Sequence, residues 1–431
     1  MHAPPPATAK VREKLAALGW SHWIIASLVI VVGMLTTRYA DEYLRLDRAR
    51  DALSQKLLEW SWRSPQPGDV KVVLIEDDEY WYGAPAGRVP IKRSYLADLV
   101  DALDQANAQV IALDFDMRLP HPPKLEDFPI YQEESLRLAK AVGAAAKRHK
   151  VVLSKTIHRA EDGHYGLEPD VYQLYGICTQ LDRDGHWKHA GTAELPLDSD
   201  AAQNINCGYI VLNTDRRELP AQEPLADGTQ LDSFSLAVAR AHNPDRVADT
   251  GTQLRYASYI PANKLAPMMY SAHGVLTRDP RVLSRLNGQT VIVGGGWSSF
   301  AAGRGRKIDL HDTPVGEMNG AVVHANFAEA FLDGRAYYHV PAVVTLSLEA
   351  LLGLAAAMTF ALFPSPLAKF LSLVSATVVL TLIEWLTLNL FGLFLEVFIP
   401  FVGVWVHSLI EGFLAEAPGH QPAVQLSGGS Q

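Results

Sequence analysis

Apolar residues gather near the two ends of the chain, whereas the long middle alternates between strand-like and helix-like patterns. From Leu15 to Thr37 no acidic or basic side chain occurs apart from the titratable His22, a run of 23 residues. As a helix this run is about 34 Å long, enough to cross a hydrocarbon core of about 30 Å. A cleaved signal peptide is the alternative, but no convincing small-x-small cleavage site follows. The pattern therefore favours an uncleaved transmembrane helix over 15–37.

The second apolar region, about 340–414, is too long for a single membrane span. Pro364 and Pro366 interrupt it once, because proline ends helices, and Asn389 and Gly392 interrupt it again. The pattern predicts three more transmembrane helices, over 340–363, 367–388 and 393–414.

Four spans place both ends of the chain on one side of the membrane and the region 39–338 on the other. Lys369 borders the short connection at Pro364, whereas no basic residue lies at the Asn389 connection. The positive-inside rule then places the polar tails 1–14 and 415–431 in the cytoplasm, the second as a disordered segment. We therefore expect 39–338 to be an extracytoplasmic domain.

Strand and helix signals alternate along this domain. Short runs rich in β-branched residues occur at 70–76, 108–116, 150–157, 208–213, 253–258 and 289–294. Helical periodicity occurs at 93–106, 131–148, 233–241 and 320–334. Such alternation is typical of an α/β fold in which helices flank a mostly parallel sheet.

The overall composition narrows the classes of partner. The formal net charge is −9, so the chain offers no basic field for nucleic acid. Its two cysteines, Cys178 and Cys207, both lie in the middle domain and can pair if that domain is exported. Two free thiols are an equally good interpretation, because a large domain needs no disulfide.

Three glycines, Gly294–Gly296, follow the strand predicted at 289–294 and raise the question of a phosphate-binding loop. A dinucleotide turn needs a third glycine where Ser299 stands, and no G-x-x-x-x-G-K-[ST] string occurs. We interpret the glycines as a turn by which the strand leaves the edge of the sheet. No cofactor is expected.

Polar side chains at three places are candidates for function. Glu76, Asp77 and Asp114 end the first two strands, where open α/β sheets hold ligands and where acids also cap helices. A weaker cation hypothesis joins Asp309, His311, Asp312 and His324, although no metal-binding motif supports it and no metal is expected. In the membrane segments, the polar residues are Glu349, Glu384 and His407, which we expect to face other helices.

His324 and Asn326 lie two positions apart on the last predicted helix, so their side chains point about 200° apart. They cannot both face one ligand by helix geometry alone. We predict a structural role, in which one of them bonds to the turn at Thr313 and Pro314.

Several segments resemble the CHASE2 family of extracellular sensory domains. They are VVLIEDDEYW, RVPIKRSYLADLVDALDQANAQVIALDFDM, CGYIVLNTDRRELP, RLNGQTVIVGG and DLHDTPVGEMNGAVVHANFAEAFLDG, together covering about 45–340. Val89 stands where this family often has tryptophan. The resemblance implies an extracytoplasmic sensory domain followed by three membrane helices. The candidate ligand-binding residues of this domain are Glu76, Asp77, Arg93, Asp114, Asp215, Arg216, Asp309, Thr313, His324 and Asn326.

The predicted function is therefore a multi-pass sensor in a bacterial inner membrane, with the large domain in the periplasm. It detects an unknown small-molecule or envelope ligand and passes the signal through its helices to a separate output protein, since no output module is expected in 415–431. It is not expected to be an enzyme, and its oligomeric state, a homodimer included, is left open. The alternatives are a metal-dependent envelope enzyme and a docking subunit of a membrane complex.

Overall fold

The computed structural model describes residues 55–62, 65–116, 128–159, 165–167, 199–212, 218–225, 228, 230–247, 254–301, 304–341 and 365–395, with a few positions of 343–355. The chain divides into two compact units. One is Leu58–Tyr338, and the other joins Met1–Leu57 with His339–Gln431.

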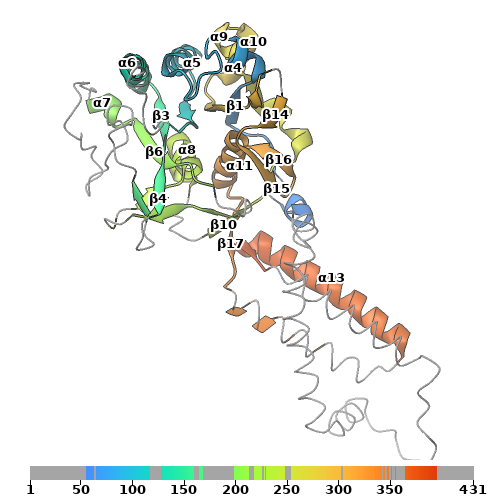
Figure 1. The fold of residues 1–431 in the computed structure, drawn as a ribbon. Helices are drawn as coiled ribbons and strands as arrows, with labels where there is room; N and C mark the ends of the chain where they lie inside the picture. The colour runs from blue at the N-terminus through green and yellow to red at the C-terminus, as the bar shows by residue number, and fades with distance from the viewer. Residues whose placement is uncertain are drawn as a thin grey trace, which may run out of the picture. The chain divides into compact units, whose positions relative to one another are not determined.

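A parallel sheet forms the centre of the Leu58–Tyr338 unit (Figure 1). Within the described residues it has six strands, in the order β11-β1-β12-β2-β3-β6, and every neighbouring pair is parallel. The strands are β1 (Val70–Ile75), β2 (Val110–Leu113), β3 (Lys150–Lys155), β6 (Ile205–Tyr209), β11 (Met269–Ser271) and β12 (Thr290–Gly295).

Helices cover both faces of this sheet, which is why its strands are nearly continuous apolar runs. On one face pack α5 (Arg93–Gln105), α6 (Phe128–Ala146), α9 (Ala272–Leu276) and α10 (Pro280–Leu286). On the other face pack α8 (Phe234–His242) and α11 (Gly320–Leu332). Figure 1 shows α5 and α6 on the side of the sheet opposite α8 and α11. The predicted α/β fold with a parallel sheet is confirmed.

Smaller elements surround this core. An antiparallel group contains β7 (Glu218–Pro220), β10 (Leu254–Ala257) and β17 (Ala336–His339). Four hairpins pair β4 (Ile157–Arg159) with β5 (Tyr165–Leu167), β8 (Gln222–Pro224) with β9 (Gln230–Asp232), β13 (Ser298–Phe300) with β14 (Arg304–Lys307), and β15 (Leu310–Thr313) with β16 (Gly316–Asn319), counted within the described ranges. The short helices are α4 (Asp77–Tyr82), α7 (Ser199–Ala202), η3 (Pro244–Arg246), η4 (Ala262–Lys264) and η5 (Ala266–Met268).

The strand expected at 253–258 formed as β10, which pairs antiparallel outside the parallel sheet. Two details of the sequence prediction were wrong. The strand expected at 208–213 lies at Ile205–Tyr209. The strand β12 lies in the middle of the sheet, between β1 and β2, so the glycines at its end do not lead off an edge. They are required by packing, because a Cβ at Gly294 would collide with the Cβ of Ala321 on α11.

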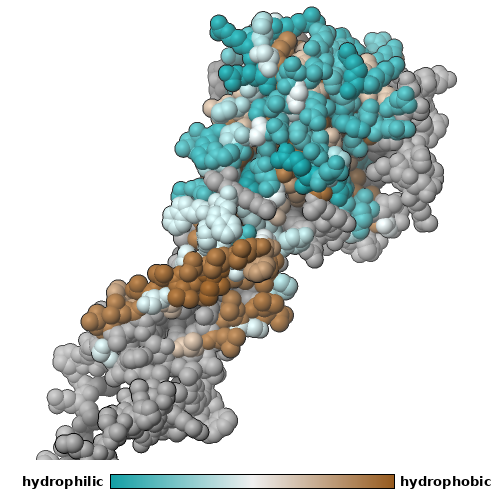
Figure 2. All heavy atoms as spheres, turned by 180° about the vertical axis from the view of Figure 1, so that it is seen from behind, coloured by the Kyte–Doolittle hydropathy of each residue, from teal (hydrophilic) through white to brown (hydrophobic). Residues whose placement is uncertain are grey.

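The second unit contains α13 (Pro366–Phe391), which coincides with the helix expected over 367–388. Among the described residues, Val374–Phe391 is the one segment long and apolar enough to cross a membrane. The helix ends before Gly392, whose φ is +66°. Figure 2 shows the hydrophobic surface of α13, whereas the face of the Leu58–Tyr338 unit seen in this view is mostly hydrophilic. The expected span 15–37 and most of the spans 340–363 and 393–414 lie outside the described residues. The described start of the last span contains the short strand β18 (Leu393–Phe394).

Candidate functional site

The carboxyl ends of the three neighbouring strands β1, β12 and β2 meet at one edge of the sheet. Asp77 follows β1 at this edge, Asp114 follows β2, and Gly294 and Gly295 end β12 between them. In open parallel sheets this edge is where ligands bind. The sequence-predicted acids are therefore brought to one side of the molecule, although each has its own surroundings.

Asp114 is the most enclosed of these acids. Its side chain is 8% exposed, and its backbone N–H donates to Val293 O over 2.9 Å. A Cβ on Gly294 would lie 3.7 Å from its Oδ2 atom, so the carboxyl lies against the glycine backbone. Burial, aided by the negative charge of Asp309, raises the pKa of Asp114 well above its usual range. Burial therefore favours the protonated form of this carboxyl.

His324 lies beside Asp114 and is bonded to the helix α8. Its Nδ1 atom lies 2.9 Å from Ser235 Oγ, and its Nε2 atom lies 3.9 Å from Asp114 Oδ1. The ring also packs edge-on against Phe234, with 5.2 Å between ring centroids. An acid, a histidine and a serine in sequence invite comparison with a nucleophilic triad. Ser235 is fully buried, however, and 3.9 Å is too long for a hydrogen bond between His324 and Asp114. The group therefore lacks the geometry of a triad, and the bond between His324 and Ser235 joins α11 to α8.

The four residues of the cation hypothesis separate into two groups. His311 Nε2 lies 2.7 Å from Asp309 Oδ1, whereas His324 lies beside Asp114 and Ser235. Asp312 is exposed on the β15–β16 hairpin. In the part of the chain that the structure describes, no group of three or more His, Cys, Asp or Glu residues is arranged to hold a metal ion.

Asp309 has a structural task as well as an exposed side chain. Its φ is +51°, and its backbone O accepts the N–H of Gly320, the first residue of α11, over 2.9 Å. Its carboxylate lies directly over Gly320, where a Cβ would collide with it. Gly320 therefore allows the chain before the β15–β16 hairpin to pack against the start of α11.

Asp77 fastens the β13–β14 hairpin to the start of α4. Its Oδ1 atom accepts Ser298 N–H over 2.6 Å, and its Oδ2 atom accepts from Ser298 Oγ over 3.1 Å and from Lys307 Nζ over 2.9 Å. Burial of the carboxyl favours a higher pKa, but these donors outweigh it, so the pKa of Asp77 lies below its usual value. Asp77 is thus an ionised structural tie.

Arg93 is also engaged within the fold. It is 4% exposed, its backbone N–H donates to Glu134 Oε2 over 3.0 Å, and its guanidinium donates to Ser135 Oγ. Arg88 forms a bidentate pair with the same Glu134. Arg88 and Arg93 therefore tie the start of α5 to α6. Between them, Val89 is 80% exposed and precedes a cis peptide bond to Pro90.

Asn326 and Thr313 do not contact each other as predicted. Asn326 Oδ1 accepts Ile260 N–H over 2.7 Å, and its Nδ2 donates to Val322 O over 2.9 Å. The Thr313 hydroxyl donates to Gly316 O inside its own hairpin. The expected bond from His324 or Asn326 to the Thr313 turn was therefore wrong. The two side chains face different partners, as the helix geometry predicted, and both are buried, at 2% and 1% exposure.

The remaining candidates divide by position. Glu76 is exposed at the end of β1, and Asp215 and Arg216 lie outside the described residues. Glu349 and His407 also lie outside them. Glu384 on α13 is 3% exposed and shares a buried stripe with Leu380 and Leu388, spaced four residues apart. This fits the expectation that Glu384 faces protein.

An aromatic group at the same edge was not predicted from the sequence. Tyr80 stacks on Trp297 with 3.9 Å between ring centroids and 7° between planes, and Trp81 packs edge-on against Tyr80. The Trp81 indole N–H donates to Ser298 O over 3.2 Å. The signal was present in DDEYWY, where aromatic residues follow the acids, but their partner Trp297 is over 200 positions away.

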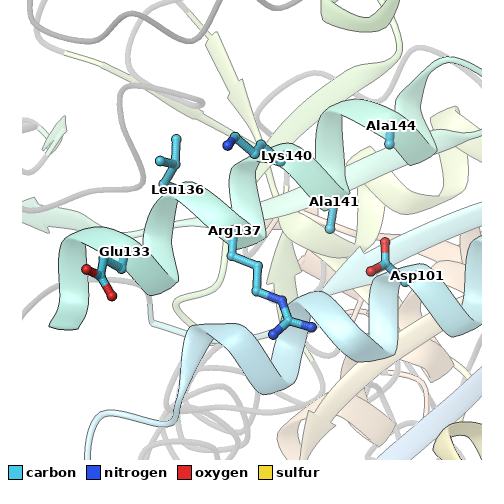
Figure 3. A pocket seen from close by; sticks show the side chains of 7 residues that line it. All are labelled: Asp101, Glu133, Leu136, Arg137, Lys140, Ala141 and Ala144. Carbon is cyan, nitrogen blue, oxygen red and sulfur yellow. The ribbon is translucent and has the colours of Figure 1, made fainter.

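A groove of about 420 Å³ lies between α5 and α6, away from this edge (Figure 3). Arg137 extends from α6 toward α5, where Asp101 lies. The lining residues are Asp101, Glu133, Leu136, Arg137, Lys140, Ala141 and Ala144. Two acids and two bases balance one another, so the groove selects no particular charge.

Comparison with known families decides the relationship. The family model for the CHASE2 domain matches residues 25–362. The chain belongs to the CHASE2 family. No curated protein and no solved structure matches it. CHASE2 domains are extracellular sensory domains, so this chain carries a sensory domain. The CHASE2 match includes the α/β unit and extends into the membrane spans expected on either side of it.

Proposed function

We propose that this protein is a multi-pass sensor of the bacterial inner membrane, with its CHASE2 domain on the periplasmic side. It detects an envelope or environmental ligand and relays the signal through its transmembrane helices to a separate output protein. The family match over 25–362 carries this proposal. We propose no enzymatic activity, since sensing rather than catalysis is the role of the family.

The geometry of the sheet edge supports recognition more than chemistry. Ser235 and His324, which would have to act as nucleophile and base, are buried. Asp77 and Arg93 are engaged in ties within the fold. Of the candidates at this edge, Glu76 and Asp309 have exposed side chains. We propose that a ligand contacts the domain through these two acids.

The surface of α13 supports a location in the membrane. Large apolar side chains are exposed along it, among them Phe370, Val378, Leu382 and Phe391. Such a surface is unfavourable in water and favourable in lipid. A signal can pass through such helices only if the ligand binds two of their arrangements with different affinity.

Cysteine-accessibility labelling in whole cells tests the proposed topology. Single cysteines are placed within 158–190 and at Ser427, in a background where Cys178 and Cys207 are serine. A membrane-impermeant maleimide should label the first position in intact cells and the second only after permeabilisation. The reverse pattern would place the CHASE2 domain in the cytoplasm and contradict the proposal.

A further inference from the structure

A buried carboxyl holds the beginning of β1 in place. Glu329, on α11, is 1% exposed. Its Oε1 atom accepts Gly68 N–H over 3.1 Å and Val70 N–H over 2.6 Å. A Cβ on Gly68 would lie 2.5 Å from Glu329 Oε2, so this approach requires a glycine. The carboxyl thus joins residues about 260 positions apart, at the edge of the sheet opposite the candidate site.

We call the contact of Glu329 with Gly68 and Val70, together with the segment after α11, the junction. Ion pairs of charged side chains surround it. Arg246 donates to Leu332 O over 3.2 Å and lies 3.3 Å from both Asp69 Oδ2 and Asp333 Oδ1. Arg335 is 1% exposed, and its Nε donates to Asp333 over 3.2 Å. The segments before β1 and after α11 are therefore bonded to each other through η3.

The junction lies where the domain is connected to the two expected membrane spans that flank it. Gly68–Val70 is where the chain enters the sheet after the expected first span, 15–37. Asp333–Arg335 is where it leaves α11, a few residues before the expected second span, 340–363. Both connections from the sensory domain to membrane helices are thus held at one cluster, and a change there acts on both.

Glu329 is placed to gain or lose a proton near neutral pH. Burial raises its pKa to about 7, opposed by the Val70 N–H and Arg335 and aided by Asp333 and Asp69. The charged or titratable groups around the junction are Asp69 and Lys71 from β1 and its approach, His242 and Arg246 from α8 and η3, and Asp333 and Arg335 after α11. Burial lowers the pKa of Lys71 and of His242.

We propose that Glu329 is a proton-responsive latch that couples external pH to the two membrane connections of the CHASE2 domain. The proposal rests on the proposed sensory function and names the proton as one of its signals. When Glu329 is protonated, its neutral carboxyl stays buried and keeps its hydrogen bonds to the N–H groups of Gly68 and Val70, which is the closed state of the junction. When it is ionised, burial of the charge favours opening toward water.

The direction of the pH effect on opening follows from the difference between the pKa of Glu329 in the closed and open states. An open junction would expose Glu329 to water, where its pKa is near 4.5, whereas the closed junction has a pKa of about 7. The closed state therefore binds the proton more tightly, and acid favours it. Opening should increase as the pH rises from about 4.5 to 7 and level off above 7.

Hydrogen–deuterium exchange of the full chain in lipid nanodiscs tests this latch. After correction for the intrinsic exchange rate, amides of 65–70 and 333–338 should exchange about tenfold faster or more at pH 7 than at pH 5, because one pKa unit corresponds to a factor of ten. Glu329→Gln, which imitates the protonated form, should exchange slowly at both pH values. Glu223→Gln is the matched control, since burial also raises the pKa of this distant acid, and it should keep the wild-type profile.

A second variant keeps the test decisive if Glu329→Gln does not fold. Asp333 raises the pKa of Glu329, so Asp333→Asn should move the plateau of the exchange profile to lower pH. The latch is refuted by a wild-type profile that is flat between pH 5 and 7, or by a Glu329→Gln profile that still rises. A reversed topology in the labelling experiment would refute the proposed function and leave this exchange profile unchanged.

Discussion

The side-chain amide of Asn326 and the backbone N–H of Ile260 meet across 66 positions, with 2.7 Å between Oδ1 and N. Ile260 follows β10 and is fully buried, so its N–H has no access to water. Asn326 supplies the acceptor that this buried donor needs. The bond joins α11 to the segment after β10 and explains why a polar side chain occupies a helix that is buried on all sides.

Replacing Asn326 with Ala should lower the free energy of unfolding by about 1–3 kcal/mol, because it leaves the Ile260 N–H buried without an acceptor. Chemical denaturation of the full chain in detergent would measure the change. The control is Asn287→Ala, since Asn287 is exposed and its side chain is hydrogen-bonded to the exposed Asn107 side chain. A change of similar size in both variants would contradict the assigned role.

Asp114→Asn should stabilise the protein at neutral pH. Burial raises the pKa of Asp114 in the folded protein above the value of about 3.8 that it has in the unfolded chain. The folded state is therefore stabilised by the protonated carboxyl below pH 3.8, and this stabilisation is lost as the pH rises through the pKa of the folded state. An amide has no charge to bury, and we expect the melting temperature at pH 7 to rise by about 2–4 °C, equivalent to about 1 kcal/mol. The gain should disappear toward pH 4. A loss of stability at pH 7 would contradict a raised pKa of Asp114 in the fold.

Asp77→Asn should release the β13–β14 hairpin. The pKa of Asp77 is lowered, so its contribution is present above pH 3.8 and is lost as the pH falls below that value. At pH 7 we expect amides of 298–307 to exchange about three- to tenfold faster, the factor that one weakened hydrogen bond produces. Asp78→Asn alters an exposed neighbouring acid and should have no effect. Equal exchange rates in both variants would contradict the role of Asp77 in holding the β13–β14 hairpin.

Cys207 is disulfide-bonded in the structure, and it is buried in β6. The chain has one other cysteine, Cys178, which lies outside the described residues. A disulfide suits the oxidising periplasm. The non-reduced protein should therefore gain about 2 Da on reduction, the mass of two hydrogens. An unchanged intact mass would mean free thiols.

The sequence by itself determined most of the local structure. The run VIAL is apolar throughout and VKVVLI is apolar apart from Lys71, which predicted buried parallel strands, and the periodic helices α5, α6, α8 and α11 formed close to where they were expected. Local sequence was sufficient here because an apolar run or stripe has few ways to avoid water. It was insufficient for β6, whose position depends on the close approach of Gly208 to Phe234.

Only the tertiary structure decided how distant residues combine. The place of β12 between β1 and β2 follows from packing across the whole chain. It explains Gly294 and Gly295, because a Cβ at these positions would collide with Ala321 and Trp297. The pairing of His324 with Ser235 and Asp114, and of Glu329 with Gly68 and Val70, could not be foreseen, because periodicity records which face of an element is apolar and not which element it meets. Burial of a carboxyl such as Glu329 depends on its neighbours from elsewhere in the chain, and so does its pKa.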